Sequence, residues 1–155
     1  MIRVSKNGVY IFCADQQFSY IFNECEKQDL IVRKYEWLKP NPNIMNGQHF
    51  WLSSGELAVC AKVRNGLFTG NCEKAYQIKK DNIEARNHPN QKPIEIISDF
   101  IKKSSNEGDV ILDPFLGGGT TVWASKQLNR KYIGIELQEK YCQIAESRLR
   151  QEILL

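Results

Sequence analysis

Residues 113 to 121, DPFLGGGTT, directly follow the apolar run Val-Ile-Leu at 110–112. A short apolar run that ends in an acid and three consecutive glycines predicts a buried strand, here 109–113, that turns tightly into a helix. That helix is expected from Thr120 to about Leu128. Glycines let a turn bring its backbone close to a bound molecule, because no side chains stand in the way. The stretch therefore predicts a binding site for a molecule that suits both a carboxylate and a bare backbone.

The same pattern continues on both sides of this turn. Downstream, KYIGIE at 131–136 predicts another strand, and a helix is expected from 138 to about 150. Its apolar side is formed by Tyr141, Ile144, Ala145 and Leu149. Upstream, Pro93 suits the first turn of a helix whose buried face is Ile97, Phe100 and Ile101.

The N-terminal half predicts three strands and one helix. GVYIFCAD at 8–15 is typical of a strand buried on both faces, and the segments at 31–39 and 56–63 are also predicted strands. On the strand at 31–39, one side should carry Ile31, Arg33, Tyr35 and Trp37. A helical stripe is formed by Phe18, Ile21, Phe22 and Cys25. Strands that alternate with helices predict an α/β fold with a parallel sheet covered on both faces.

In two segments the hydrophobic residues follow neither a helical nor a strand period, and both segments are expected to be loops. PNPNIMNGQHFWLSSG, which begins at Pro40, contains two prolines and an Asn-Gly pair. Residues 64–92 are expected to hold at most short elements. With 155 residues in all, the chain fits one domain.

The composition is that of an ordinary globular protein, with 42% hydrophobic and 25% charged residues. No run of 18 apolar residues is present, and MIRVSKNG at the start lacks the apolar core of a signal peptide. An intracellular, cytoplasmic protein without a membrane partner is expected. The five cysteines are scattered without a CxxC pair, so we expect reduced thiols and neither disulfides nor a metal site.

Positive charge is concentrated in one segment. Residues 62–92 hold seven basic and three acidic side chains, a local charge of +4 in a chain whose net charge is +3. Such an excess is most often a solvated loop, and it also suits contact with nucleic-acid phosphates. The residues proposed for DNA contact are Lys62, Arg64, Lys79, Lys80 and Arg86.

The glycine turn fits phosphate ligands poorly. A Walker loop needs a lysine after its glycines, and none follows here. A dinucleotide fingerprint needs a third small residue, but Val122 stands at that position. Asp113 at the strand end would also repel a pyrophosphate. A tight turn with no ligand is the remaining structural alternative.

S-adenosylmethionine suits the turn better, because Asp113 can accept hydrogen bonds from its ammonium group. Gly117, Gly118 and Gly119 would lie beneath the cofactor, and Phe115 is expected against its adenine. Glu136 ends the next strand, 19 residues after Gly117, where an acid can bind both ribose hydroxyls.

Three stretches closely resemble the C-terminal half of the DNA methyltransferases that modify the amino group of adenine or cytosine: HPNQKP at 88–93, GDVILDPFLGGGTTVWA and RKYIGIELQEKYCQIAESRL. The similarity is to the permuted subclass in which the catalytic segment precedes the cofactor segment. RVSKNGVYIFCADQQ and YEWLKPNPN resemble segments that follow the catalytic motif, so the resemblance spans nearly the whole chain.

The resemblance implies a single methyltransferase domain over residues 1–155 with a Rossmann-like sheet, S-adenosylmethionine as cofactor and double-stranded DNA as partner. It makes Asp113, Phe115, Gly117, Gly119 and Glu136 cofactor residues. Two further cofactor residues are expected, Thr120 after the glycines and Lys92, which would border the methionine carboxylate; by itself, Lys92 is equally well a surface lysine before a helix.

The catalytic motif of that family is Asp, Ser or Asn, then Pro-Pro, then an aromatic. None of the five prolines in this chain is adjacent to another, and NPNI at 41–44 lacks the second proline and the aromatic, so no catalytic residue is predicted. The resemblance places the motif just before Met1, on the central strand of the sheet. The sheet is therefore expected to be incomplete at that strand, with cofactor binding at best weak and no methylation by the chain alone.

The predicted function is an S-adenosylmethionine-dependent DNA methyltransferase, with adenine favoured over cytosine. One alternative is a non-catalytic remnant or split-enzyme subunit that needs a second polypeptide carrying the motif. Another is a methyltransferase that acts on RNA or a small molecule.

Overall fold

The computed structural model describes residues 2–40, 55–70, 75–77 and 91–150. The chain folds into two compact units, Met1–Lys80 and Asp81–Leu155. The loop predicted after Pro40 and most of the basic segment lie outside the described residues.

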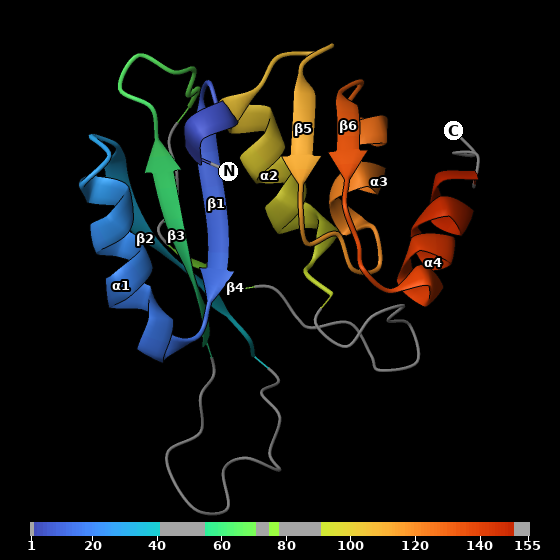
Figure 1. The fold of residues 1–155 in the computed structure, drawn as a ribbon, viewed down its shortest axis with the longest axis horizontal. Helices are drawn as coiled ribbons and strands as arrows, with labels where there is room; N and C mark the ends of the chain where they lie inside the picture. Colours follow the sequence, from blue (N-terminus) through green and yellow to red (C-terminus); the bar gives the residue numbers. More distant parts are fainter. Residues whose placement is uncertain (1, 41–54, 71–74, 78–90, 151–155) are drawn as a thin grey trace, which may run out of the picture. The chain divides into compact units, whose positions relative to one another are not determined.

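The first unit holds a four-stranded sheet in the order β1-β3-β2-β4, with one long helix (Figure 1). Its elements are a 3-10 turn at Ile2–Val4, β1 at Gly8–Cys13, α1 at Asp15–Glu26, β2 at Ile31–Leu38, β3 at Gly55–Lys62 and the short β4 at Ala75–Gln77. These bounds confirm the three predicted strands and the helix to within a few residues. The β4 strand is the one short element described in the basic segment.

The strand directions in this sheet differ from the prediction of a parallel sheet. β3 pairs antiparallel with both β1 and β2, while β2 and β4 are parallel. The sequence between Leu38 and Gly55 contains Pro40, Pro42 and an Asn-Gly pair, a composition that disfavours the crossover helix on which a parallel pair usually depends. β1 and β2, which a helix does connect, are not neighbours, because β3 lies between them.

The core of the first unit lies between α1 and one face of the sheet. Its fully buried members are Cys25, Val32, Val59 and Ala61. The predicted stripe residues Phe18, Ile21 and Phe22 pack around this cluster, which confirms the helical face.

The side of β2 predicted to carry Arg33, Tyr35 and Trp37 is only partly buried. Tyr35 and Trp37 are buried, whereas Arg33 is exposed. The expectation that β1 is buried on both faces is wrong. Val9 is its one buried residue, because β1 lies at the edge of the described sheet.

The second unit holds two parallel strands and three helices among its described residues. Its elements are α2 at Ile94–Ser104, β5 at Val110–Asp113, α3 at Thr120–Gln127, β6 at Lys131–Gly134 and α4 at Glu139–Arg150. The parallel register runs from Val110 opposite Lys131 to Asp113 opposite Gly134. All five elements agree with the predictions to within a few residues. On α2 the buried face contains Ile96, Phe100 and Ile101, so Ile96 takes the place predicted for Ile97, which is half-buried.

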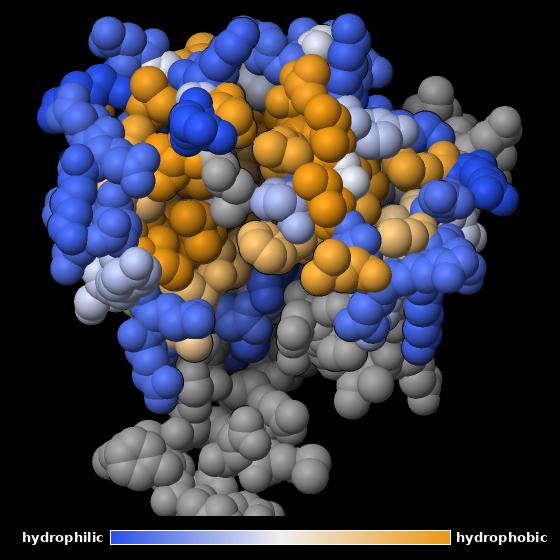
Figure 2. All heavy atoms as spheres, viewed as in Figure 1, coloured by the Kyte–Doolittle hydropathy of each residue, from blue (hydrophilic) through white to orange (hydrophobic). Residues whose placement is uncertain are grey.

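One face of the β5–β6 pair is left open by the described elements, in contrast to the prediction of a sheet covered on both faces. α3 contacts both strands, whereas Val110 is 56% exposed and Ile133 is 53% exposed. Figure 2 shows apolar side chains gathered over these two strands. The described strands form two sheets that share no ladder.

No helix within the described ranges is long and apolar enough to cross a membrane.

Candidate functional site

The turn after β5 has the conformation that its glycines permit. Gly117 and Gly119 adopt positive φ values of 53° and 85°, in the region that favours glycine. Asp113 accepts a hydrogen bond on Oδ1 from the Phe115 amide at 3.0 Å, and the Gly119 amide donates to the Leu116 carbonyl at 3.2 Å. The carboxylate therefore stabilises the beginning of the turn from the carboxyl end of the strand.

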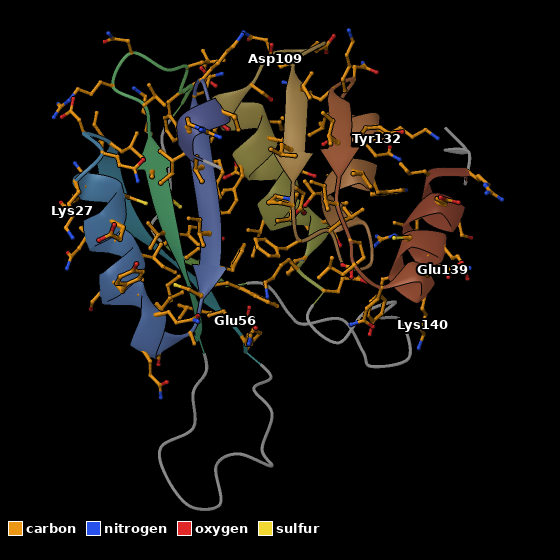
Figure 3. All side chains as sticks on the ribbon, in the orientation of Figure 1. Lys27, Glu56, Asp109, Tyr132, Glu139 and Lys140 are labelled. Carbon is orange, nitrogen blue, oxygen red and sulfur yellow. The ribbon has the colours of Figure 1, made fainter. Side chains whose placement is uncertain are left out.

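Glu136 lies directly beside the glycine turn. Its Oε2 accepts a hydrogen bond from the Gly117 amide at 2.9 Å, and its Oε1 accepts one from the Gln138 amide at 2.9 Å. Both bonds fix the carboxylate at the end of β6, before α4. Figure 3 labels Glu139 and Lys140 at the beginning of that helix. A carboxylate oxygen can accept more than one hydrogen bond, so a carboxylate at this position suits the hydroxyl groups of a ligand.

Neighbouring atoms pack closely around two of the glycines. A Cβ placed on Gly119 would lie 2.7 Å from the Cβ of Ala145 on α4. A Cβ on Gly134 would lie 2.5 Å from Cδ2 of Leu116. The turn is therefore packed against α4 on one side and β6 on the other.

Two large apolar side chains near this turn are exposed. Phe115 is 81% exposed and Leu137 is 97% exposed. Leu137 follows Glu136 directly in the sequence. Phe115 was predicted from the sequence, whereas Leu137 was missed; the available signal was an apolar residue immediately after the acid that ends the strand.

The remaining predicted cofactor residues differ in burial and position. Gly118, within the turn, and Thr120, the first residue of α3, are both buried. Lys92 is half-buried and immediately precedes Pro93, the residue before α2, so its contact with a carboxylate stays a prediction. Arg148 on α4 was not predicted, yet it donates to the Gly118 carbonyl at 2.9 Å. Its distance of 30 residues along the chain hides that contact from local sequence patterns.

Of the five residues proposed for DNA contact, Lys62 and Arg64 are described. Lys62 donates to the Arg64 carbonyl at 3.0 Å, and the Arg64 guanidinium binds both carboxylate oxygens of Asp29. Hydrogen bonds from Arg64, and then its charge, lower the pKa of Asp29. Lys79, Lys80 and Arg86 lie outside the described residues.

No group of three His, Cys, Asp or Glu side chains that could hold a metal occurs among residues 2–40, 55–70, 75–77 and 91–150.

Residues 3–147 match the family model described as DNA methylase, which covers the N6 and N4 enzymes. The chain belongs to this family. The match spans both units, so the resemblance inferred from the sequence motifs is confirmed.

Two curated relatives match different lengths of the chain. The Type II methyltransferase M.HinfI of Haemophilus influenzae is 33% identical over 78% of this chain and 40% of its own length. The orphan methyltransferase M.BamHII of Bacillus amyloliquefaciens is 47% identical over 44% of this chain and 26% of its own length. The chain therefore spans less than half the length of these two relatives.

Solved structures confirm the α/β methyltransferase fold. The crystal structure of an M1.HpyAVI–SAM complex superposes with a TM-score of 0.80 at 32% identity and covers 96% of this chain and 77% of that chain. PvuII DNA methyltransferase, described as cytosine-N4-specific, superposes with a TM-score of 0.76 at 14% identity, over 96% of this chain and 64% of its own. The second similarity concerns the fold alone.

Proposed function

We propose that this chain binds S-adenosylmethionine at the glycine turn and provides the cofactor-binding part of a DNA amino-methyltransferase. The observation that carries the proposal is the position of Glu136, whose carboxylate lies at the glycine turn and hydrogen-bonds to the Gly117 and Gln138 amides. A carboxylate at this position suits two ribose hydroxyls. A solved relative at 32% identity is a complex with SAM, which supports this cofactor.

The residues of the turn suit the parts of this cofactor. Asp113 offers a carboxylate to the ammonium group, and the exposed Phe115 and Leu137 offer apolar surface to the adenine. The bound cofactor supplies an electrophilic methyl group on its sulfonium sulfur. The residues of this chain would bind and orient that group, since positioning two reactants lowers the barrier to their reaction.

Calorimetric titration with S-adenosylmethionine tests the proposal. We expect weak binding, with a dissociation constant on the order of 0.1–1 mM. Glu136→Ala should weaken it at least tenfold, because charged hydrogen bonds to the ribose are lost; that factor is about 1.4 kcal/mol. Glu139→Ala, which removes an exposed acid three residues later, is the matched control. Equal affinity in the two variants would exclude the proposed ribose contact.

We further propose that methyl transfer requires a catalytic motif from outside these 155 residues. An exocyclic amine is a poor nucleophile, and the family's Pro-Pro-aromatic motif activates it and stacks the flipped base. No two prolines are adjacent in this sequence. The exposed apolar face of β5 and β6 supports a further polypeptide segment at this sheet.

A mixing experiment distinguishes a split or truncated enzyme from a non-catalytic remnant. The chain is combined with a polypeptide that carries the upstream half of a relative, and transfer of labelled methyl groups to duplex DNA is measured. If only the mixture is active, and neither polypeptide by itself, the chain is part of a split or truncated enzyme. Activity of the chain by itself would contradict the need for another segment. A mixture that stays inactive, with the cofactor bound, favours the non-catalytic remnant.

The proposed substrate is double-stranded DNA, with the amino group of adenine as target and that of cytosine as the alternative. The family match and the Type II methyltransferase relative support DNA over RNA or a small molecule. Mass spectrometry of the nucleosides from the active mixture distinguishes N6-methyladenine from N4-methylcytosine. Competition between duplex DNA and RNA of the same sequence tests the RNA alternative.

A further inference from the structure

Arg148 connects the last turn of α4 to the glycine turn. Its Nη1 lies 2.9 Å from the Gly118 carbonyl oxygen and 3.4 Å from the Thr120 hydroxyl oxygen. Its Cζ lies 5.8 Å from the ring centroid of Trp123. The side chain is half-buried, and the stronger hydrogen bond joins residues that are 30 positions apart.

The glycine turn needs contacts of this kind to keep one conformation. Three consecutive glycines have no side chains that restrict φ and ψ, so their peptide groups can rotate at little steric cost. In this chain the peptide group between Gly118 and Gly119 is fixed at both ends. Its carbonyl accepts from Arg148, and its amide donates to the Leu116 carbonyl. Gly117, one residue earlier, is fixed by Glu136.

Electrostatics of the helices does not explain the position of the guanidinium. A basic residue in the last turn of α4 is favourable with respect to that helix. The Arg148 guanidinium, however, extends to Thr120, the first residue of α3, where the partial charge of the helix terminus is positive. The charged hydrogen bond to Gly118 offsets this unfavourable position, since charge-assisted bonds are stronger than neutral ones.

We propose that Arg148 is a positioning residue that preorganises the glycine turn for the cofactor. It does so by fixing the Gly118–Gly119 peptide group from the side of α4, while Glu136 fixes Gly117 from the side of β6. The inference rests on the proposed binding of S-adenosylmethionine.

The test compares Arg148→Met with Arg148→Lys and Arg150→Met. Methionine keeps an unbranched apolar stem and removes the donors, and lysine restores one charged donor. Arg150, in the same turn of α4, is exposed and pairs with Glu146 at 3.3 Å, so its substitution is the matched control. Two quantities are measured: hydrogen exchange of the Gly119 amide without ligand, and the dissociation constant for S-adenosylhomocysteine.

In Arg148→Met we expect exchange at Gly119 to accelerate about tenfold or more and the dissociation constant to rise by a similar factor, as for loss of one charged hydrogen bond. Arg148→Lys should recover part of both effects, and Arg150→Met should match the wild type. Unchanged exchange and affinity in Arg148→Met would overturn the proposal. Faster exchange throughout α2, α3, β5 and β6 would also overturn it, since Arg148 would then be a general stabiliser.

The exchange rate and the dissociation constant test the role of Arg148 and the identity of the cofactor separately. If the wild type binds no S-adenosylhomocysteine, the cofactor assignment fails. The exchange rate of the Gly119 amide in the free protein still shows whether Arg148 fixes the turn.

Discussion

Gly119 combines a positive φ with close packing against Ala145, so its substitution has two separable costs. Gly108, in the same unit, has a similar φ of 81°, but a Cβ there would meet no described atom within 4 Å. Alanine at Gly108 should cost about 1 to 2 kcal/mol of unfolding free energy through backbone strain. Alanine at Gly119 should cost about 1 to 3 kcal/mol more through overpacking. Equal losses in urea unfolding would contradict the packing of the turn against α4.

Cys25 is buried in the core of the first unit, and burial, followed by the charge of Glu24, raises the pKa of its thiol. A raised folded-state pKa means that the folded protein favours the neutral thiol. Its contribution to stability is therefore fully present below the pKa of the unfolded chain and is lost as pH rises through the folded pKa. Unfolding free energy measured between about pH 8 and pH 11 should fall less steeply in Cys25→Ala than in the wild type. An unchanged slope would contradict the burial of the thiol.

At single residues, the sequence predicts the site where chemistry dictates the residue type. A carboxylate at a strand end and a run of glycines predict Asp113, Gly119 and Glu136 as cofactor residues, and the structure brings Glu136 to the glycine turn. Arg148 was missed because its contact depends on how α4 packs against the turn, which no periodicity reveals. Leu137 was missed because one apolar residue at a strand end is not a distinctive pattern.

Among the elements, Arg130 connects the beginning of β6 to the end of α2. Its guanidinium donates to the Ser105 carbonyl at 2.8 Å, the Ser105 hydroxyl at 3.2 Å and the Leu128 carbonyl at 2.5 Å. Ser105 is buried, so Arg130→Met should leave its carbonyl unsatisfied and cost about 1 to 3 kcal/mol. Chemical denaturation checks this value. Lys131→Met, at the exposed neighbour, should change stability by less than about 0.5 kcal/mol, and an equal loss there would contradict the role of Arg130.

The elements themselves were predicted well, because amphipathic helices and short apolar strands have strong local patterns. The helical stripe of α1 and the glycine turn before α3 are examples. The order of the strands was not predicted. The placement of β3 between β1 and β2, and its antiparallel direction, depend on tertiary pairing that local patterns do not reveal.

For the whole molecule, the basic segment predicts salt-dependent DNA binding. Each phosphate contact contributes about 0.9 to the slope of log K against log salt. Replacing Lys79, Lys80 and Arg86 with glutamine should therefore lower the magnitude of that slope by about 2 to 3. Replacing Lys27, Lys34 and Arg150, which the structure places in exposed ion pairs, changes the net charge equally and is the control. Equal slopes for the two triple variants would contradict a specific role for the segment.

The glycine turn and Glu136 are proposed to bind a sulfonium nucleoside and not a phosphorylated one. This choice is tested by an amide NMR titration of the 17.9 kDa chain with S-adenosylmethionine and, separately, with NAD. We expect S-adenosylmethionine to shift the amide signals of Gly117, Gly118, Gly119 and Leu137, while NAD leaves them unchanged. Shifts caused by NAD, or none with S-adenosylmethionine, would show that the assignment is wrong.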